Sequence, residues 1–212
     1  FKGNRNLIAV TGDSAGAYIS AMIVNSGNKL ATSGSFAEHL CIKPSYLPES
    51  ITFDEIKKEN LLDVQAAVLS YGRYDLYSPA VEGILETRKN LFWTLALSKP
   101  RGVFGKNFDV KKNPEMYKAI SPIYNIPTAE ERKLPPQFIT SASRDRVTPV
   151  HAIEEYVKAL KDAGQEVTYW EYKDQRHAYL DSGKTFLSGN DFKRDAIPAL
   201  KKIMDFLNSK LL

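Results

Sequence analysis

The sequence has a single cysteine, Cys41, so the chain cannot form an internal disulfide bond. His39 lies two residues away, but one thiol and one imidazole do not complete a metal site. No apolar run approaches the ~20 residues that a membrane-spanning helix needs, and no targeting segment is visible in residues 1–6. The sequence therefore does not determine the cellular compartment, and we favour the cytoplasm.

The sequence also lacks a concentration of charge of one sign. It contains 29 lysines and arginines against 25 aspartates and glutamates, for a net charge of +4. The lysine pairs at 57–58, 111–112 and 201–202 are separate and form no basic stripe, so we expect no nucleic-acid partner. Hydrophobic residues make up 43% of the 212 residues, which is enough for one domain with a substantial core.

What the sequence does contain is a Gly-x-Ser-x-Gly motif at residues 12–16. An apolar, strand-like run at Leu7–Val10 precedes it, and residues 15–24 follow with helical spacing. A strand that enters a helix through this motif is typical of a nucleophile elbow, a tight turn that lifts the serine hydroxyl off the sheet. We predict Ser14 as the nucleophile and the amide of Ala15 as an oxyanion donor. The remaining elbow residues would be Gly12, Asp13 and Gly16.

Strand-like and helical segments alternate along the rest of the chain. Apolar segments at 64–71, 137–142 and 167–172 predict strands, and the spacing at 149–163 and 192–211 predicts helices. This alternation indicates the α/β class, with a mainly parallel sheet and helices on both faces. We expect one domain over residues 1–212, with a surface insertion at about 27–63 and a helical cap at about 76–120.

A serine nucleophile needs a base, and the base must be oriented by a third group. Asp145 and His177 each follow a predicted strand, and with Ser14 they occur in the order serine, acid, histidine. The carboxyl ends of parallel strands meet at one edge of the sheet, so we expect these three side chains to converge. His177 would be the base and Asp145 the acid.

Other titratable residues near these positions have simpler expected roles. His39 lies in the irregular insertion, and His151 lies inside the helix that follows Asp145. Asp174 shares a loop with the proposed base and is the less favoured acid. Asp75 follows the predicted strand at 64–71, where we expect it to cap the local backbone.

The motif Gly12-Asp13-Ser14-Ala15-Gly16, taken with Asp145 and His177, resembles the hormone-sensitive-lipase-like esterases of the α/β-hydrolase superfamily. The resemblance spans nearly the whole chain and covers the part of that fold from the nucleophile strand onward. His177-Ala178-Tyr179 stands where the family usually has His-Gly-Phe. The resemblance implies an α/β-hydrolase fold and hydrolysis of short- to medium-chain carboxylic esters through an acyl-enzyme. It also implies that no metal or organic cofactor is needed.

The sequence departs from that family in three places, one of which is an insertion at 25–63 that is longer than the family leads us to expect. The family's upstream His-Gly-Gly-Gly loop, which supplies further oxyanion-hole amides, is absent here together with the N-terminal strands of the fold. The acid loop at 144–149 is closer to the Asp-x-x-Val loop of related carboxylesterases and peptidases. We therefore expect the chain to need its missing N-terminal segment, either covalently joined or as a separate partner. The sequence is also compatible with an oligomer.

A serine carboxylesterase acting on a small-molecule ester is the leading hypothesis, and two alternatives remain open. A peptidase or another acyl-transfer hydrolase would use the same triad, because esters and amides both pass through a tetrahedral oxyanion. A non-catalytic binding protein on this fold is favoured by the missing part of the oxyanion hole. The complete set of Ser14, Asp145 and His177 opposes that second alternative.

Overall fold

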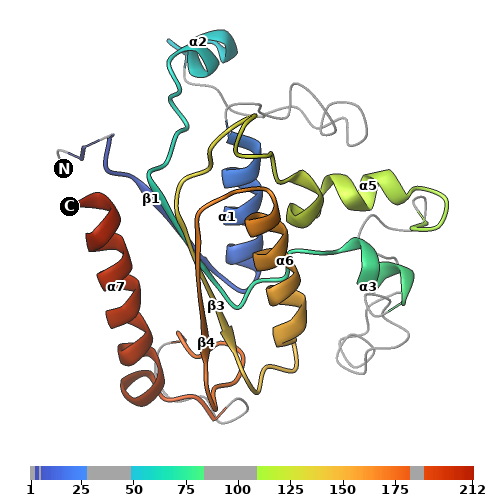
Figure 1. Ribbon diagram of the computed structural model, residues 1–212, viewed down its shortest axis with the longest axis vertical. Coiled ribbons are helices and arrows are strands. Elements are labelled where there is room, and N and C mark those ends of the chain that lie inside the picture. Colours follow the sequence, from blue (N-terminus) through green and yellow to red (C-terminus); the bar gives the residue numbers. More distant parts are fainter. Residues whose placement is uncertain (1–2, 5, 28–48, 84–108, 182–188) are drawn as a thin grey trace.

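A computed structural model describes residues 3–4, 6–27, 49–83, 109–181 and 189–212 of the chain (Figure 1). Within these ranges, four parallel strands form one sheet in the order β1-β2-β3-β4. The strands are β1 (Ala9–Asp13), β2 (Ala66–Ser70), β3 (Gln137–Ala142) and β4 (Val167–Tyr172). The helices are α1 (Ala15–Ser26), α2 (Phe53–Lys58), α3 (Tyr77–Val81), α5 (Pro114–Ala119), η4 (Pro122–Asn125), α6 (Val150–Asp162), η5 (Phe192–Ala196) and α7 (Ile197–Leu211).

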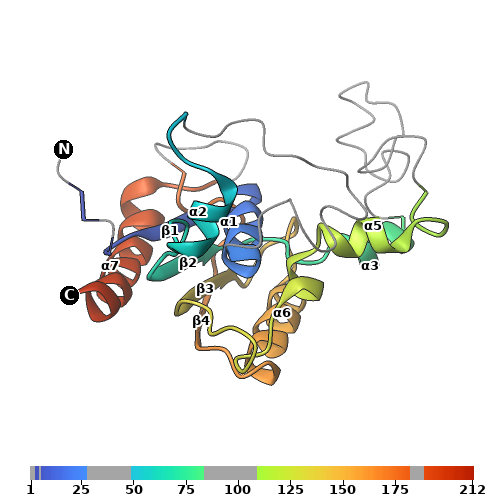
Figure 2. The same cartoon turned by 90° about the horizontal axis from the view of Figure 1, so that it is seen from above.

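Helices cover both faces of the sheet, as the alternating pattern predicted. Figures 1 and 2 show α1 and α6 on one face and α7 on the other. In β2, Ala67 and Leu69 join the core under α1 and α6, whereas Ala66 and Val68 face α7. A strand that is buried on both faces cannot alternate apolar and polar residues, which explains the continuous apolar run at this position.

The sheet edge formed by β1 is less covered than its centre. Among the described strands, β1 has a hydrogen-bonded neighbour only on its β2 side. Some apolar side chains of α1 and α7 face solvent: Ile19 in α1 is 55% exposed and Met204 in α7 is 60% exposed. Leu7 and Ile8, which the sequence placed in the first strand, lie before it and are also exposed. Apolar side chains of α1, of α7 and of the segment directly before β1 are therefore accessible to solvent.

The C-terminal helix begins differently from the prediction. The sequence predicts one continuous helix over 192–211, but the first turn, η5, is π-helical, and α7 starts at Ile197. Pro198 has no amide hydrogen and cannot donate to the carbonyl four residues earlier. The amide of Ile197 instead bonds to the carbonyl of Phe192, which widens the turn. At the end of α6, Gly164 (φ +74°) terminates the helix as expected.

Two expected segments fall mainly outside the described residues. Residues 28–48 make up much of the surface insertion expected at 27–63, and residues 84–108 make up much of the cap expected at 76–120. Within the described part of the insertion, α2 ends at Lys58. The boundaries of the insertion and the cap stay predictions.

Candidate active site

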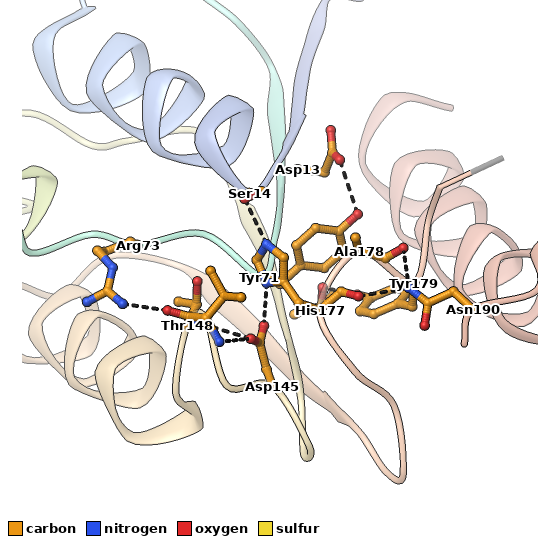
Figure 3. Close-up of polar contacts among 12 residues, drawn as sticks. Asp13, Ser14, Tyr71, Arg73, Asp145, Thr148, His177, Ala178, Tyr179 and Asn190 are labelled. Carbon is orange, nitrogen blue, oxygen red and sulfur yellow. Dashed lines mark hydrogen bonds and ion pairs between the residues drawn. The ribbon is translucent and has the colours of Figure 1, made fainter. Parts of the chain in front are cut away.

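Ser14, Asp145 and His177 lie in direct contact at the carboxyl ends of β1, β3 and β4 (Figure 3). Ser14 Oγ is 2.9 Å from His177 Nε2, and His177 Nδ1 is 2.7 Å from Asp145 Oδ2. A carboxylate only accepts hydrogen bonds, so Nδ1 carries the proton and Nε2 is left to accept from the serine hydroxyl. The structure thus brings together the three residues that the sequence grouped, although Ser14 and His177 are 163 positions apart.

The Asp145 end of this chain of hydrogen bonds is closed to water. The side chain of Asp145 is fully buried, whereas 18% of the His177 side chain is exposed. Asp145 Oδ1 accepts the backbone amides of Val147 at 2.7 Å and Thr148 at 2.8 Å. These bonds hold the carboxylate in place while its other oxygen contacts the imidazole, so the histidine ring is oriented from a rigid loop.

The turn around Ser14 has the strained backbone of a nucleophile elbow. Ser14 has φ 50° and ψ −115°, a combination that is rare for a residue with a side chain and costs on the order of 1–3 kcal/mol. Its amide donates to the carbonyl of Ser70 at 2.9 Å, which ties the turn to β2. A Cβ added at Gly12 would lie 2.2 Å from the carbonyl oxygen of Gly16. Glycine is therefore sterically required at residue 12.

The second glycine of the motif has more room. A Cβ added at Gly16 would meet only Asp13 Oδ1 within 4 Å, at a distance of 3.8 Å, which is ordinary van der Waals contact. The two glycines of the motif therefore differ: Gly12 allows the close approach of helix α1 to strand β1, and Gly16 does not occupy a crowded position.

Tyr71, directly after β2, connects the elbow to the histidine. Its ring packs edge-on against His177 with centroids 5.0 Å apart, and its hydroxyl donates to Asp13 Oδ2 at 3.1 Å. The residue is fully buried and has φ 41°. Burial, and next the charge of Asp13, raise the pKa of Tyr71 far above the usual tyrosine range, so the phenol stays protonated. The sequence placed Tyr71 only at the end of a strand, and no motif marked it.

Arg73 supports the acid loop from β2's exit loop. Its guanidinium donates to the carbonyl of Val147 at 2.5 Å. Burial lowers the pKa of Arg73, while the carboxylates of Asp145 and Asp75 act in the opposite direction. Asp75 itself caps the backbone, as expected, because its Oδ1 accepts the amides of Tyr77 (2.7 Å) and Ser78 (3.1 Å).

The residues that the sequence set aside lie away from this centre. Asp174 is largely exposed and pairs with Arg144 at 2.7 Å. His151 is exposed on α6, and His39 falls outside the described residues. In the described ranges, no cluster of three or more His, Cys, Asp or Glu side chains is arranged to hold a metal ion. No helix in these ranges is long and apolar enough to cross a membrane.

A family model described as the alpha/beta hydrolase fold matches residues 1–181. The chain belongs to the α/β-hydrolase fold family. The family match and the esterase relatives confirm the resemblance to the hormone-sensitive-lipase-like esterases that the elbow motif indicated. The parallel sheet with helices on both faces agrees with this assignment.

This α/β hydrolase is similar to proteins described as esterases and to a peptidase. It is 28% identical over 188 residues to esterase LipC of Mycobacterium tuberculosis, a match that covers 87% of this chain and 38% of that protein. Esterase 2 of Thermogutta terrifontis, phosphoramylated by tabun, aligns with a TM-score of 0.50 at 16% identity, covering 94% of this chain and 55% of the other. An acylaminoacyl peptidase of Pyrococcus horikoshii aligns with a TM-score of 0.59 at 17% identity, covering 99% and 25%. At these identities the two structures show a shared fold.

The chain spans little more than a third of the length of the curated relatives it matches. LipC is covered over 38% of its length and a second M. tuberculosis esterase, LipQ, over 34%. Most of the polypeptide of each relative therefore lies outside the segment matched here.

Proposed function

We propose that this α/β hydrolase is a serine carboxylesterase, with Ser14 as nucleophile, His177 as base and Asp145 as acid. The observation that carries the proposal is the unbroken hydrogen-bonded chain from Ser14 Oγ through both ring nitrogens of His177 to a buried carboxylate. The strained backbone at Ser14 is a second support, because strain of this kind persists where the surrounding fold enforces it.

The geometry suits acyl transfer in two steps. As Ser14 Oγ attacks the ester carbonyl, His177 Nε2 accepts the serine proton and then delivers it to the leaving alcohol. The acyl-enzyme formed in this way is hydrolysed when His177 takes a proton from water and returns it to Ser14. Asp145 stays ionised throughout, holding the Nδ1 proton and stabilising the imidazolium.

The oxyanion formed in both steps needs hydrogen-bond donors. We assign the amide of Ala15, the first residue of α1, to this task, since the amino end of a 12-residue helix carries partial positive charge. The family resemblance adds acyl chains of short to medium length as the substrate range. One amide is a partial hole, and losing a donor typically costs about 10²–10³ in rate.

We further propose that additional polypeptide of the same protein pairs with the outer edge of β1 and completes the oxyanion hole. Three observations support it: β1 has a single neighbour among the described strands, Leu7 and Ile8 directly before it are exposed, and the chain matches only part of its relatives' length. An unpaired apolar edge favours association with another strand. A folded, monomeric product consisting of these 212 residues alone would contradict this proposal.

The test of the esterase is covalent labelling followed by turnover. The protein is treated with a fluorophosphonate, its intact mass is measured, and hydrolysis of p-nitrophenyl acetate and butyrate is followed. We expect one adduct, lost in Ser14→Ala together with turnover, while circular dichroism stays unchanged. Ser209→Ala, near the end of α7, is the matched control and should keep both adduct and turnover. Unchanged turnover in Ser14→Ala would contradict the proposal.

The same preparation decides between esters and amides. Aminoacyl-arylamides are assayed beside the p-nitrophenyl esters under identical conditions. The acid loop at 144–149 resembles that of some peptidases. A higher kcat/KM for the amides than for the esters would therefore mean that the protein is a peptidase and not an esterase. No adduct on folded protein that includes the additional polypeptide would instead favour a binding protein.

A further inference from the structure

The residue directly after the proposed base has an unfavourable backbone conformation. Ala178 has φ 62°, in the left-handed region where a Cβ clashes with the following carbonyl. This conformation turns the chain between His177 and the buried Tyr179, so it sets the direction from which the imidazole approaches Ser14. A strained residue at this point needs contacts from outside the loop to keep it in place.

One side chain provides such contacts on both sides of the strained residue. Asn190 Nδ2 donates to the carbonyl of His177 at 2.8 Å and to the carbonyl of Ala178 at 2.8 Å. Asn190 is 5% exposed, so water does not readily replace these bonds. Asn190 belongs to the segment that precedes η5 and α7 in the chain. Figure 3 shows it on the opposite side of His177 from Arg73 and Thr148.

Asn190 is held in turn by the start of the C-terminal helix. The next residue, Asp191, caps η5 through its side chain, and its amide donates to Asp195 Oδ2 at 2.8 Å. Asp195 is fully buried, and Gln175 Nε2, from the loop that carries His177, donates to its Oδ1 at 3.1 Å. The hydrogen bond from Arg194 is the main cause that lowers the pKa of Asp195, so it is an anionic acceptor at neutral pH. The histidine loop is thus attached to this helix start at two points.

We propose that Asn190 is a positioning residue for His177, which holds the strained Ala178 turn and keeps the imidazole between Ser14 and Asp145. The inference rests on the proposed serine hydrolase, in which a small displacement of the base slows proton transfer. Asn190 acts through the two backbone carbonyls rather than as a catalytic group. With Asn190, the site includes the segment before η5 and α7 as well as the loops at the carboxyl ends of the strands.

The test combines substitutions at the two residues. Asn190→Asp keeps the size of the side chain but removes the amide donors, and Asn190→Ala removes the whole group. For both we expect kcat for p-nitrophenyl esters to fall about 10–100-fold, with KM changed by less than about threefold, because misplacement by ~1 Å carries a cost of that order. Glycine adopts the left-handed region without a clash. Ala178→Gly should therefore recover about tenfold of the lost kcat in the Asn190→Ala background.

A second readout makes the inference independent of turnover. The Nδ1 proton of His177, bonded to Asp145, should give a far-downfield proton resonance in the wild type. We expect it to broaden or disappear in Asn190→Ala and to return in Asn190→Ala with Ala178→Gly. If the resonance behaves in this way in a protein without esterase activity, the positioning role holds and the proposed function fails. If Asn190→Ala lowers Tm but leaves the resonance and kcat intact, the residue is merely structural and the inference is overturned.

Discussion

The hydroxyl of Tyr71 donates to Asp13 Oδ2 across 3.1 Å, so a buried phenol at the end of β2 is anchored to the residue before the proposed nucleophile. The same ring packs edge-on against the imidazole of His177, 5.0 Å away. The elbow and the proposed base are therefore coupled through one side chain as well as through their direct hydrogen bond. The hydroxyl of Tyr71 therefore contacts the elbow, and its ring contacts the proposed base.

Replacing Tyr71 by Phe and by Leu tests these two contacts separately. Tyr71→Phe keeps the ring and loses one hydrogen bond to a solvent-accessible carboxylate, so it should cost about 1 kcal/mol in unfolding free energy and leave kcat within about threefold. Tyr71→Leu removes the ring contact and should lower kcat by about 10–100-fold, since the imidazole loses a packing partner. Urea unfolding and ester turnover measure the two effects. Equal kcat in both variants would show that the ring does not orient His177.

Burial of tyrosines predicts loss of stability at high pH. Burial is the main cause that raises the pKa of the four tyrosines Tyr71, Tyr74, Tyr156 and Tyr179. Their unfolded pKa is about 10, so above that pH the unfolded chain releases protons that the folded chain keeps. Well above pH 10, each such tyrosine lowers the unfolding free energy by about 1.4 kcal/mol per pH unit, and all four together by roughly 5.5 kcal/mol per pH unit. Below about pH 9 they contribute no pH dependence.

Urea unfolding at pH 9, 10 and 11 measures this slope. Tyr71→Phe is the matched variant, because it removes one titrating group and should reduce the slope between pH 10 and 11 by about 1 kcal/mol per pH unit. A stability that is flat between pH 10 and 11 in the wild type would show that the phenols ionise in the folded protein and that the packing around them is looser than described.

The two glycines of the elbow should respond oppositely to alanine. At Gly12 a Cβ would lie 2.2 Å from a backbone oxygen, so β1 and α1 must separate, and we expect a cost of about 3 kcal/mol or more with loss of turnover. At Gly16 a Cβ would make only a 3.8 Å contact, and alanine gains up to about 1 kcal/mol of helix propensity. Thermal unfolding of Gly12→Ala and Gly16→Ala compares them. A large destabilisation by Gly16→Ala would contradict the prediction.

The proposed role of Asp145 as the acid is tested against Asp174, the carboxylate in the loop that carries His177. Asp145→Asn leaves a similar shape but a neutral group opposite His177 Nδ1, which favours the wrong tautomer, and kcat should fall about 10³–10⁴-fold. Asp174→Asn removes an exposed carboxylate that pairs with Arg144 and should change kcat less than about twofold. Steady-state kinetics on one ester compares the two variants. A comparable loss in both would mean that the assignment of the acid is wrong.

Much of the fold could be predicted because its signals are local. The apolar runs at 66–70 and 137–142 are strands because a central strand buries both faces, and that requirement is visible in five or six consecutive residues. The ends of α6 follow from Pro149 before it and Gly164 after it, whose backbone preferences are properties of single residues. The π-helical start of α7 was not predicted, although Pro198 was its local cause.

The sequence by itself determined the elbow and the order of Ser14, Asp145 and His177. Both are expressed in residue types at strand ends, and parallel strands bring such ends to one edge. Only the tertiary structure decided that Tyr71 packs on the histidine, that Asn190 holds the carbonyls behind it, and that Ile19 of α1 faces outward. These facts depend on backbone carbonyls, ring orientations and sheet edges contributed by distant segments. Such partners leave no periodic trace in the chain, because any residue can present a carbonyl.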